Sequence, residues 1–308
     1  MNEKELQSSI PLIVIVMAFL FGIGTICAQE EDSVIAPGAS LKMVQSGFIF
    51  TEGPAADADG NIYFTDVRGE RIYRWYYKDD SISVYREKTG RANGLMFDQN
   101  GRLVICEMGN NRVTLDDMKG TITVLADSYK GKRLNNPNDL WIDPKGGIYF
   151  SDWLSGRGRT SVKEDGLQVY YISPDHKNLT CVTNDLIKPN GLIGTPDGKN
   201  IYIADAGANM TWVYKTQSGG TLSDKKLFCE QGSDGMARDE KNNVYVTGSS
   251  SISVYNSKGK KIEEITFPER PSNMTFAGKE RKTLFVTARR SIYTLEMAVR
   301  GALTPIEQ

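Results

Sequence analysis

The stretch TEGPAADADGNIYFTD, residues 51–66, is typical of a β-hairpin: a short strand, a turn rich in aspartate and glycine, and a second strand. The same arrangement recurs five times, each copy beginning 39 to 52 residues after the one before. The other copies span residues 92–107, 137–152, 189–205, 233–248 and 272–288. This period is the length of a four-stranded propeller blade. We therefore predict an all-β fold, a six-bladed β-propeller with four antiparallel strands per blade.

The N-terminal part of the chain is expected to close the ring. The sixth copy is followed by a single further strand, SIYTLEM at 291–297, so its blade would lack a fourth strand. The early segment SLKMVQS, residues 40–46, has no blade of its own. Because an unpaired sheet edge is a liability, we expect this strand to pair there. The propeller is then one domain over residues 40–300, with a linker at 29–39 and a tail at 301–308.

Residues 1–28 have the composition of a signal peptide, with an apolar run from Ile10 that ends at the small residue Ala28. We therefore expect a secreted or periplasmic protein that has no membrane contact after the leader is removed. An uncleaved membrane anchor is the alternative, because the run is nearly long enough to span a bilayer.

Charge, histidine and cysteine content exclude several classes of function. The formal net charge is −1, so a basic surface for nucleic acid is not expected. The single histidine, His176, lies in the turn-forming segment SPDHKN and is expected at the surface. This excludes a Ser-His-Asp triad and a histidine-bound zinc. The cysteines beyond the leader, Cys106, Cys181 and Cys229, are odd in number and lie in apolar runs, so we expect buried free thiols.

The opening residue of every hairpin carries a side-chain oxygen. These six residues are Glu52, Asn93, Asn138, Asn190, Asp234 and Asn273. The first strand of a propeller blade lies innermost, so we expect all six side chains to converge at one end of the axis. A ring of oxygen donors without histidine or cysteine suits Ca²⁺ better than zinc or copper, and other divalent cations fit less well. The alternative is that each of these residues only bonds nearby backbone.

The second strand of four hairpins ends in a carboxylate, at Asp66, Glu107, Asp152 and Asp205. Because these strands run back to the ring end, they are expected to form a second acidic shell. The alternative is again that strand-end carboxylates bond the backbone of the adjoining loop. The long loop from Trp153 to Gln168 leaves the same end, so Trp153, Arg157 and Arg159 are candidate ligand contacts.

Four short motifs resemble one superfamily when they are taken together. EGP stands at 52–54, PND at 137–139, PNGL at 189–192 and DGM at 234–236. In this order, and over about residues 45 to 295, the chain resembles the gluconolactonase, regucalcin and diisopropyl-fluorophosphatase superfamily. Regucalcin-like members have an arginine where this chain has Asn136, so the resemblance favours the bacterial gluconolactonase-like branch.

The resemblance implies roles for individual residues. Glu52, Asn138, Asn190 and Asp234 match the residues that hold the catalytic metal, and Asp234 also matches the proposed acid or base. Asn93 and Asn273 match no ligand, so the direct ligand set shrinks from six residues to four. We expect the substrate to contact Arg91, Asn93, Asn136 and Trp153.

The function expected from these observations is calcium-dependent hydrolysis of a small sugar lactone by a metal-activated water, with the lactone as the partner molecule. A non-catalytic extracellular binding propeller is the first alternative, because YFTD, YFSD and YIAD resemble the YWTD signature of receptor propellers. A phosphotriesterase of the fluorophosphatase type is the second. This chain reads TARR at 287–290, where such enzymes carry a histidine.

Overall fold

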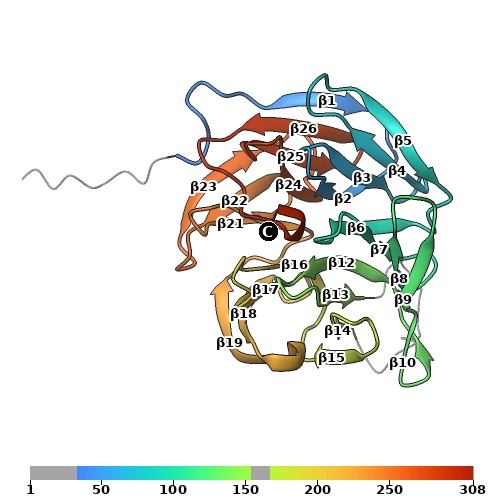
Figure 1. Cartoon of the computed structure of the whole chain (residues 1–308). Coiled ribbons are helices and arrows are strands. Elements are labelled where there is room, and N and C mark those ends of the chain that lie inside the picture. Colours follow the sequence, from blue (N-terminus) through green and yellow to red (C-terminus); the bar gives the residue numbers. More distant parts are fainter. Residues whose placement is uncertain (1–32, 154–166, 308) are drawn as a thin grey trace, which may run out of the picture. The chain divides into compact units, whose positions relative to one another are not determined.

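The computed structural model describes residues 33–153 and 167–307. Within these residues, six four-stranded antiparallel sheets surround a common axis, as Figure 1 shows. The first strand of each repeat lies nearest the axis, and the other strands follow outward in chain order. The predicted six-bladed β-propeller is therefore confirmed.

The first three blades follow one another without a break in the pattern. Blade 1 contains β2 (Thr51–Ala56), β3 (Ile62–Asp66), β4 (Arg71–Trp75) and β5 (Ile82–Glu87). Blade 2 contains β6 (Ala92–Phe97), β7 (Leu103–Glu107), β8 (Arg112–Asp116) and β9 (Ile122–Ala126). A small hairpin, β10 (Ser128–Tyr129) and β11 (Lys132–Arg133), leads to blade 3. Blade 3 contains β12 (Pro137–Ile142), β13 (Ile148–Asp152), β14 (Gln168–Ile172) and β15 (Leu179–Thr183).

The remaining blades complete the circle. Blade 4 contains β16 (Pro189–Gly194), β17 (Asn200–Asp205), β18 (Met210–Thr216) and β19 (Leu222–Cys229), with a short 3₁₀ turn, η1 (Ser218–Gly220), between the last two. Blade 5 contains β20 (Met236–Arg238), β21 (Val244–Thr247), β22 (Ser251–Tyr255) and β23 (Lys261–Thr266). Blade 6 contains β24 (Asn273–Ala277), β25 (Thr283–Ala288) and β26 (Ser291–Glu296), and is followed by η2 (Pro305–Glu307).

Blade 6 takes its fourth strand from the beginning of the propeller, as predicted. Strand β1 (Lys42–Ser46) pairs antiparallel with β26, so the sheet order is β1-β26-β25-β24. The Ser272 hydroxyl donates to the Thr51 carbonyl at 2.7 Å and joins blade 6 to blade 1. The ring is thus closed both by strand pairing and by a polar contact near the axis.

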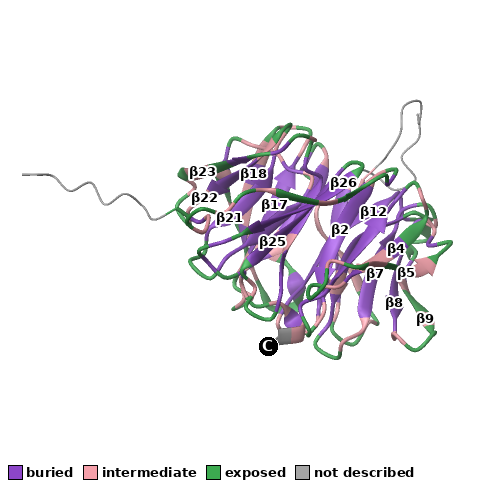
Figure 2. Ribbon diagram, turned by 90° about the horizontal axis from the view of Figure 1, so that it is seen from above, coloured by how far each residue is buried: buried purple, intermediate pink, exposed green. Residues whose placement is uncertain are grey.

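The core lies between neighbouring blades. Strands β2, β3, β7, β12 and β13 are buried along their whole length, whereas the outermost strands are half-exposed, as the colours of Figure 2 show. Inner strands pack on both faces, which explains continuous apolar runs such as IYF in β3 and LVIC in β7. Aromatic rings fill the spaces between blades. The Trp75 ring, for example, lies 5.1 Å from the ring of Phe285 in blade 6.

The pairing of the two inner strands is irregular in blades 1 to 4. The register shifts between Glu52 and Ala55 in blade 1, and in the next three blades between Ala92 and Leu95, Pro137 and Leu140, and Pro189 and Leu192. A bulge of this kind re-aims the side chains at its site. The shifts fall at the residues that the sequence places on the axis.

The remaining structural expectations concern the cysteines and the leader. Cys106 and Cys229 are buried, Cys181 is half-buried, and none of the three forms a disulfide with another described residue. The predicted leader lies outside the described residues. In residues 33–153 and 167–307, no helix is both long and apolar enough to cross a membrane.

Candidate active site

A cavity of about 930 Å³ opens at one end of the propeller axis. Five of the six predicted ring residues line it, namely Glu52, Asn93, Asn138, Asn190 and Asp234. The predicted substrate contacts also line it, namely Arg91, Asn93, Asn136 and Trp153. The cavity therefore gathers residues from five blades that are far apart in the sequence.

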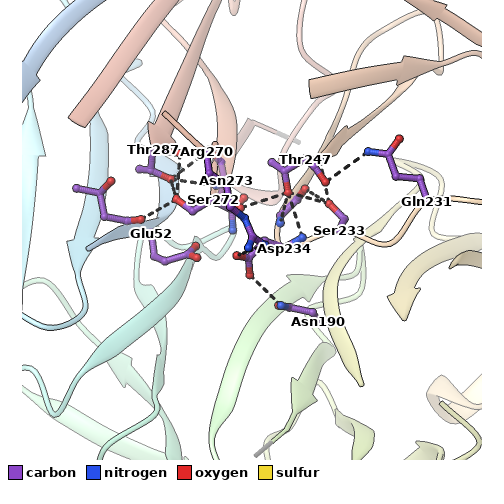
Figure 3. A network of polar contacts seen from close by, with 12 residues as sticks. Glu52, Asn190, Gln231, Ser233, Asp234, Thr247, Arg270, Ser272, Asn273 and Thr287 are labelled. Carbon is purple, nitrogen blue, oxygen red and sulfur yellow. Dashed lines mark hydrogen bonds and ion pairs between the residues drawn. The ribbon is translucent and has the colours of Figure 1, made fainter. Parts of the chain in front are cut away.

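A buried carboxylate, Glu52, and a half-buried one, Asp234, lie close enough at the axis for their charges to interact. Burial, and secondly the negative charge of Asp234, hold the pKa of Glu52 well above its ordinary value. Burial also raises the pKa of Asp234, against the opposing effect of the Arg270 guanidinium. In Figure 3, Asp234 Oδ1 accepts a hydrogen bond of 2.8 Å from Asn190 Nδ2, and Asp234 Oδ2 lies 3.5 Å from Arg270 Nη2. A cation between the carboxylates would relieve their mutual repulsion.

The side-chain oxygen of Asn190, Oδ1, is available to bind a ligand. Its Nδ2 is engaged by Asp234, but its buried Oδ1 accepts no hydrogen bond from any described residue. A buried oxygen without a donor is costly unless something else binds it. Together with two carboxylates and the Asn138 amide, it makes a set of oxygen donors of the kind that Ca²⁺ takes.

Histidine and cysteine contribute nothing to this donor set. Among the described residues, no three histidine, cysteine or acidic side chains gather into a possible metal centre. A cation on the axis would therefore depend on the amides of Asn138 and Asn190 as well as on Glu52 and Asp234.

The two asparagines that match no ligand in the motifs have other partners. Asn93 Nδ2 lies 3.1 Å from the sulfur of Met108. Asn273 lies outside the 930 Å³ cavity, and its side chain bonds Glu52 and Asp139. Its Oδ1 accepts the backbone N–H of Met274 at 2.8 Å. Asn273 therefore acts on Glu52 from outside the cavity, and its hydrogen bond favours the ionised carboxylate.

Asp139 is a residue of the axis that the sequence analysis did not select. It is 8% exposed, and burial raises its pKa to about 7. It lies on the far side of the ring, where it lines a smaller cavity of about 80 Å³. The repeats contained a signal for it: Asp139 is an acidic residue at a position where other blades have a glycine, as at Gly53, Gly94 and Gly191.

A hydroxyl on β21 fixes the backbone at Asp234. Thr247 Oγ1 accepts the N–H groups of Asp234 and Gly235 at 3.0 and 3.1 Å, and the Thr247 N–H donates to Ser233 Oγ at 3.0 Å (Figure 3). The sequence signal was the threonine or serine that recurs near the end of the second strand, as in YFTD and YFSD.

Replacing Thr247 by valine should lower both stability and the activity of the site. The change keeps the shape of the side chain but leaves two buried N–H groups without an acceptor, which costs about 1 to 3 kcal/mol. Denaturant unfolding measures the loss, and kcat should fall because Asp234 is no longer held. Thr183→Val on the outer strand β15 is the control. Equal effects of both substitutions on kcat would contradict a role for Thr247 in positioning Asp234.

Three strand-end carboxylates hold the loops that precede the ring residues. Each accepts hydrogen bonds of 2.7 to 2.9 Å from two consecutive backbone N–H groups. The sets are Asp66 with Ile49 and Phe50, Asp152 with Asn135 and Asn136, and Asp205 with Ile187 and Lys188. These carboxylates are not part of the described cavity lining, and their contacts follow the backbone-bonding alternative.

The loops held in this way deliver side chains to the cavity wall. Phe50, Asn136 and Lys188 are the second residues of the three pairs, and all of them line the cavity. Each of them stands two residues before a ring residue, and in blade 2 Arg91 holds this position before Asn93. Glu107, the fourth strand-end carboxylate, binds Arg86 and Arg112 at 3.1 and 2.7 Å instead.

The remaining sequence-selected residues divide between the cavity and the rest of the molecule. The Trp153 ring lies at the wall with Lys188 Nζ 4.0 Å from its centroid. Arg157 and Arg159 lie outside the described residues. His176 is half-buried in the turn between β14 and β15 and does not line the 930 Å³ cavity.

Comparison with known proteins supports the resemblance drawn from the motifs. A model of the SMP-30/gluconolactonase/LRE-like region matches residues 50–290. A gluconolactonase from Zymomonas mobilis is 25% identical over 302 residues, covering 88% of this chain and 85% of the relative. The structure of a Xanthomonas campestris gluconolactonase matches with a TM-score of 0.80 at 27% identity, over 86% of this chain and 91% of that one. A calcium-binding regucalcin from Agrobacterium tumefaciens shares the fold, with a TM-score of 0.73 at 18% identity over 88% and 98% of the two chains.

Proposed function

The chain belongs to the SMP-30/gluconolactonase/LRE-like family, and on this basis we propose that it hydrolyses a small sugar lactone with the help of calcium. Relatives named gluconolactonase and lactonase support lactone hydrolysis. The observation that carries the proposal is the pairing of Glu52 and Asp234 beside the free Oδ1 of Asn190, on the wall of a cavity large enough for a sugar ring.

Four residues would hold the cation: Glu52, Asn138, Asn190 and Asp234. When bound, a divalent cation supplies a Lewis acid that polarises a carbonyl oxygen and lowers the pKa of an attached water. Two carboxylates against one divalent charge leave this part of the site neutral.

The chain's own residues contribute the proton transfers. Asp234 accepts a proton from the attacking water, whose oxygen adds to the lactone carbonyl carbon. The ring C–O bond then breaks, and the departing alkoxide takes the proton from Asp234, so the product is the open hydroxy acid. The bond from Asn190 Nδ2 and the charge of Arg270 hold Asp234 in position and favour its ionised form.

A lactone panel tests this proposal. Chelated protein should open aldonolactones slowly, and added calcium should restore the rate. Turnover of a fluorophosphate without turnover of any lactone would contradict the proposal, and so would full activity in the presence of chelator.

Calcium should also stabilise the folded protein. A ligand that binds only the native state adds about 2.7 kcal/mol at a concentration 100 times its Kd. Calorimetry with and without calcium should therefore show a rise in Tm that disappears in Glu52→Gln. The control is Glu240→Gln on the protein surface, which should retain the rise. A Tm independent of calcium in the unsubstituted protein would contradict binding at the axis.

A further inference from the structure

The mouth of the axial cavity has a strong local excess of positive charge. Four cationic side chains line it: Arg68, Arg91, Lys188 and Arg270. The acidic side chains among the described lining residues are Glu52 and Asp234. The whole chain has a formal net charge of −1, so this excess belongs to the cavity and not to the protein in general.

Three of these four cations form no ion pair with any described residue. Arg270 lies 3.5 Å from Asp234, and its side chain is 48% exposed. Within the described part of the chain, no carboxylate oxygen lies within 4.0 Å of the charged groups of Arg68, Arg91 and Lys188. If a divalent cation neutralises Glu52 and Asp234, the described lining residues contain no further acidic side chain to balance the positive charge at the mouth.

The unpaired cations are held in place by the fold. Lys188 Nζ lies 4.0 Å from the centroid of the Trp153 ring, and its backbone N–H is bound by Asp205 at 2.8 Å. The Arg68 guanidinium lies over the Phe50 ring at 5.5 Å. Such cation–π contacts restrain the charged groups without neutralising them.

Arg91 is placed by an unusual backbone conformation. Its φ is 55°, in the left-handed region, and it follows Gly90 with φ 64°. The Arg91 carbonyl accepts the Met108 N–H at 3.2 Å, which holds this conformation. Left-handed backbone at a non-glycine residue costs free energy and persists where the surroundings enforce it, often at functional sites. Here it places a guanidinium group on the cavity wall.

We propose that the preferred lactone carries an anionic group, a carboxylate or a phosphate, which these cations bind at the mouth while the lactone carbonyl lies on the axis. The preference among lactones rests on the proposed function, whereas the binding of the anionic group does not. Arginine binds carboxylate and phosphate with paired, charge-assisted hydrogen bonds, and both groups match the unpaired charges.

Steady-state kinetics on three lactones test the preference at a fixed free calcium concentration. They are D-glucono-1,5-lactone, which is neutral, its 6-phosphate, and D-glucaro-1,4-lactone, which carries a carboxylate. One of the anionic substrates should have a kcat/KM about tenfold above that of the neutral one, and the advantage should shrink with added NaCl. The two anionic arms distinguish phosphate from carboxylate.

Variants connect the preference to the named residues. Arg68→Gln and Arg91→Gln should each move the ratio of anionic to neutral kcat/KM toward one. Lys258→Gln removes the same charge from an exposed turn between β22 and β23 and should retain the ratio. Equal ratios in all three variants and the unsubstituted protein would overturn the assignment to these residues.

Binding of the products separates the two proposals. Calorimetry compares gluconate with gluconate 6-phosphate and glucarate, and needs no turnover. If lactones are hydrolysed but anionic substrates and products have no advantage, the inference is wrong and the proposed function stands. If no lactone is hydrolysed but gluconate 6-phosphate or glucarate, each with a second anionic group, binds about tenfold more tightly than gluconate, the proposed function is wrong and the anion site stands.

Discussion

Replacing Asp234 by asparagine is expected to lower kcat/KM for lactone hydrolysis by about 10³-fold. The amide has nearly the same shape but cannot accept the proton of the attacking water. It also removes one of the two negative charges that a cation on the axis requires. Initial rates at saturating calcium measure the effect, and circular dichroism verifies that the propeller is intact.

The control for this substitution is Asp143→Asn. Asp143 is buried, at 8% exposure, but it belongs to the β12–β13 turn and accepts a hydrogen bond of 2.9 Å from the Tyr171 hydroxyl. It should lower stability and leave kcat close to that of the unsubstituted protein. If Asp234→Asn retained more than about a tenth of the rate, Asp234 would not be the base, because general-base catalysis contributes at least about 10²-fold.

Replacing Gly53 by alanine is expected to have the largest effect on stability. Its φ is 42°, and an added Cβ would lie 2.0 Å from the backbone carbonyl oxygen of Asn93 in the neighbouring blade. Both strands are buried at the axis, so neither can easily move away. Backbone strain and overpacking together should cost about 3 kcal/mol or more, measured by urea unfolding.

Gly219→Ala separates the two causes of that loss. Gly219 has a similar left-handed backbone, with φ 71°, but an added Cβ would meet nothing within 4 Å. It should lose about 1 kcal/mol, the cost of the backbone conformation alone. If the two substitutions cost the same, close approach of the inner strands would not be the reason for the glycine in the EGP motif.

The blades could be predicted from the sequence because each one repeats the same local signals. Short apolar runs such as IYF and LVIC mark the strands, and motifs such as DADGN mark the turns between them. Ring closure by residues 40–46 could be predicted for the same reason, since one blade was short of a strand. Strands and turns depend on residues that are close together in the sequence, so a single sequence is enough to predict them.

The details of the site depend on how blades approach each other, which local patterns do not contain. Asn273 is equivalent to Asn190 in the repeat, yet it does not line the 930 Å³ cavity, and β24 pairs with β25 without the shift seen in blades 1 to 4. In most blades the residue after the ring residue is a glycine that lies against the next blade. Asp139 holds this position in blade 3, and the packing of blade against blade that makes the position special is not visible in the sequence. Among the cations at the mouth, Arg91 and Lys188 each stand two residues before a ring residue, but no such spacing connects Arg68 and Arg270 to them.

The pairing of β1 with β26 has a consequence for biosynthesis. The first strand of the propeller to leave the ribosome must wait for the last strand before blade 6 is complete. Folding of the ring is therefore finished only after nearly the whole chain has been made. In the folded molecule, neither β1 nor β26 can detach without breaking the hydrogen bonds between them. Unfolding from one end of the propeller therefore requires the loss of this strand pair.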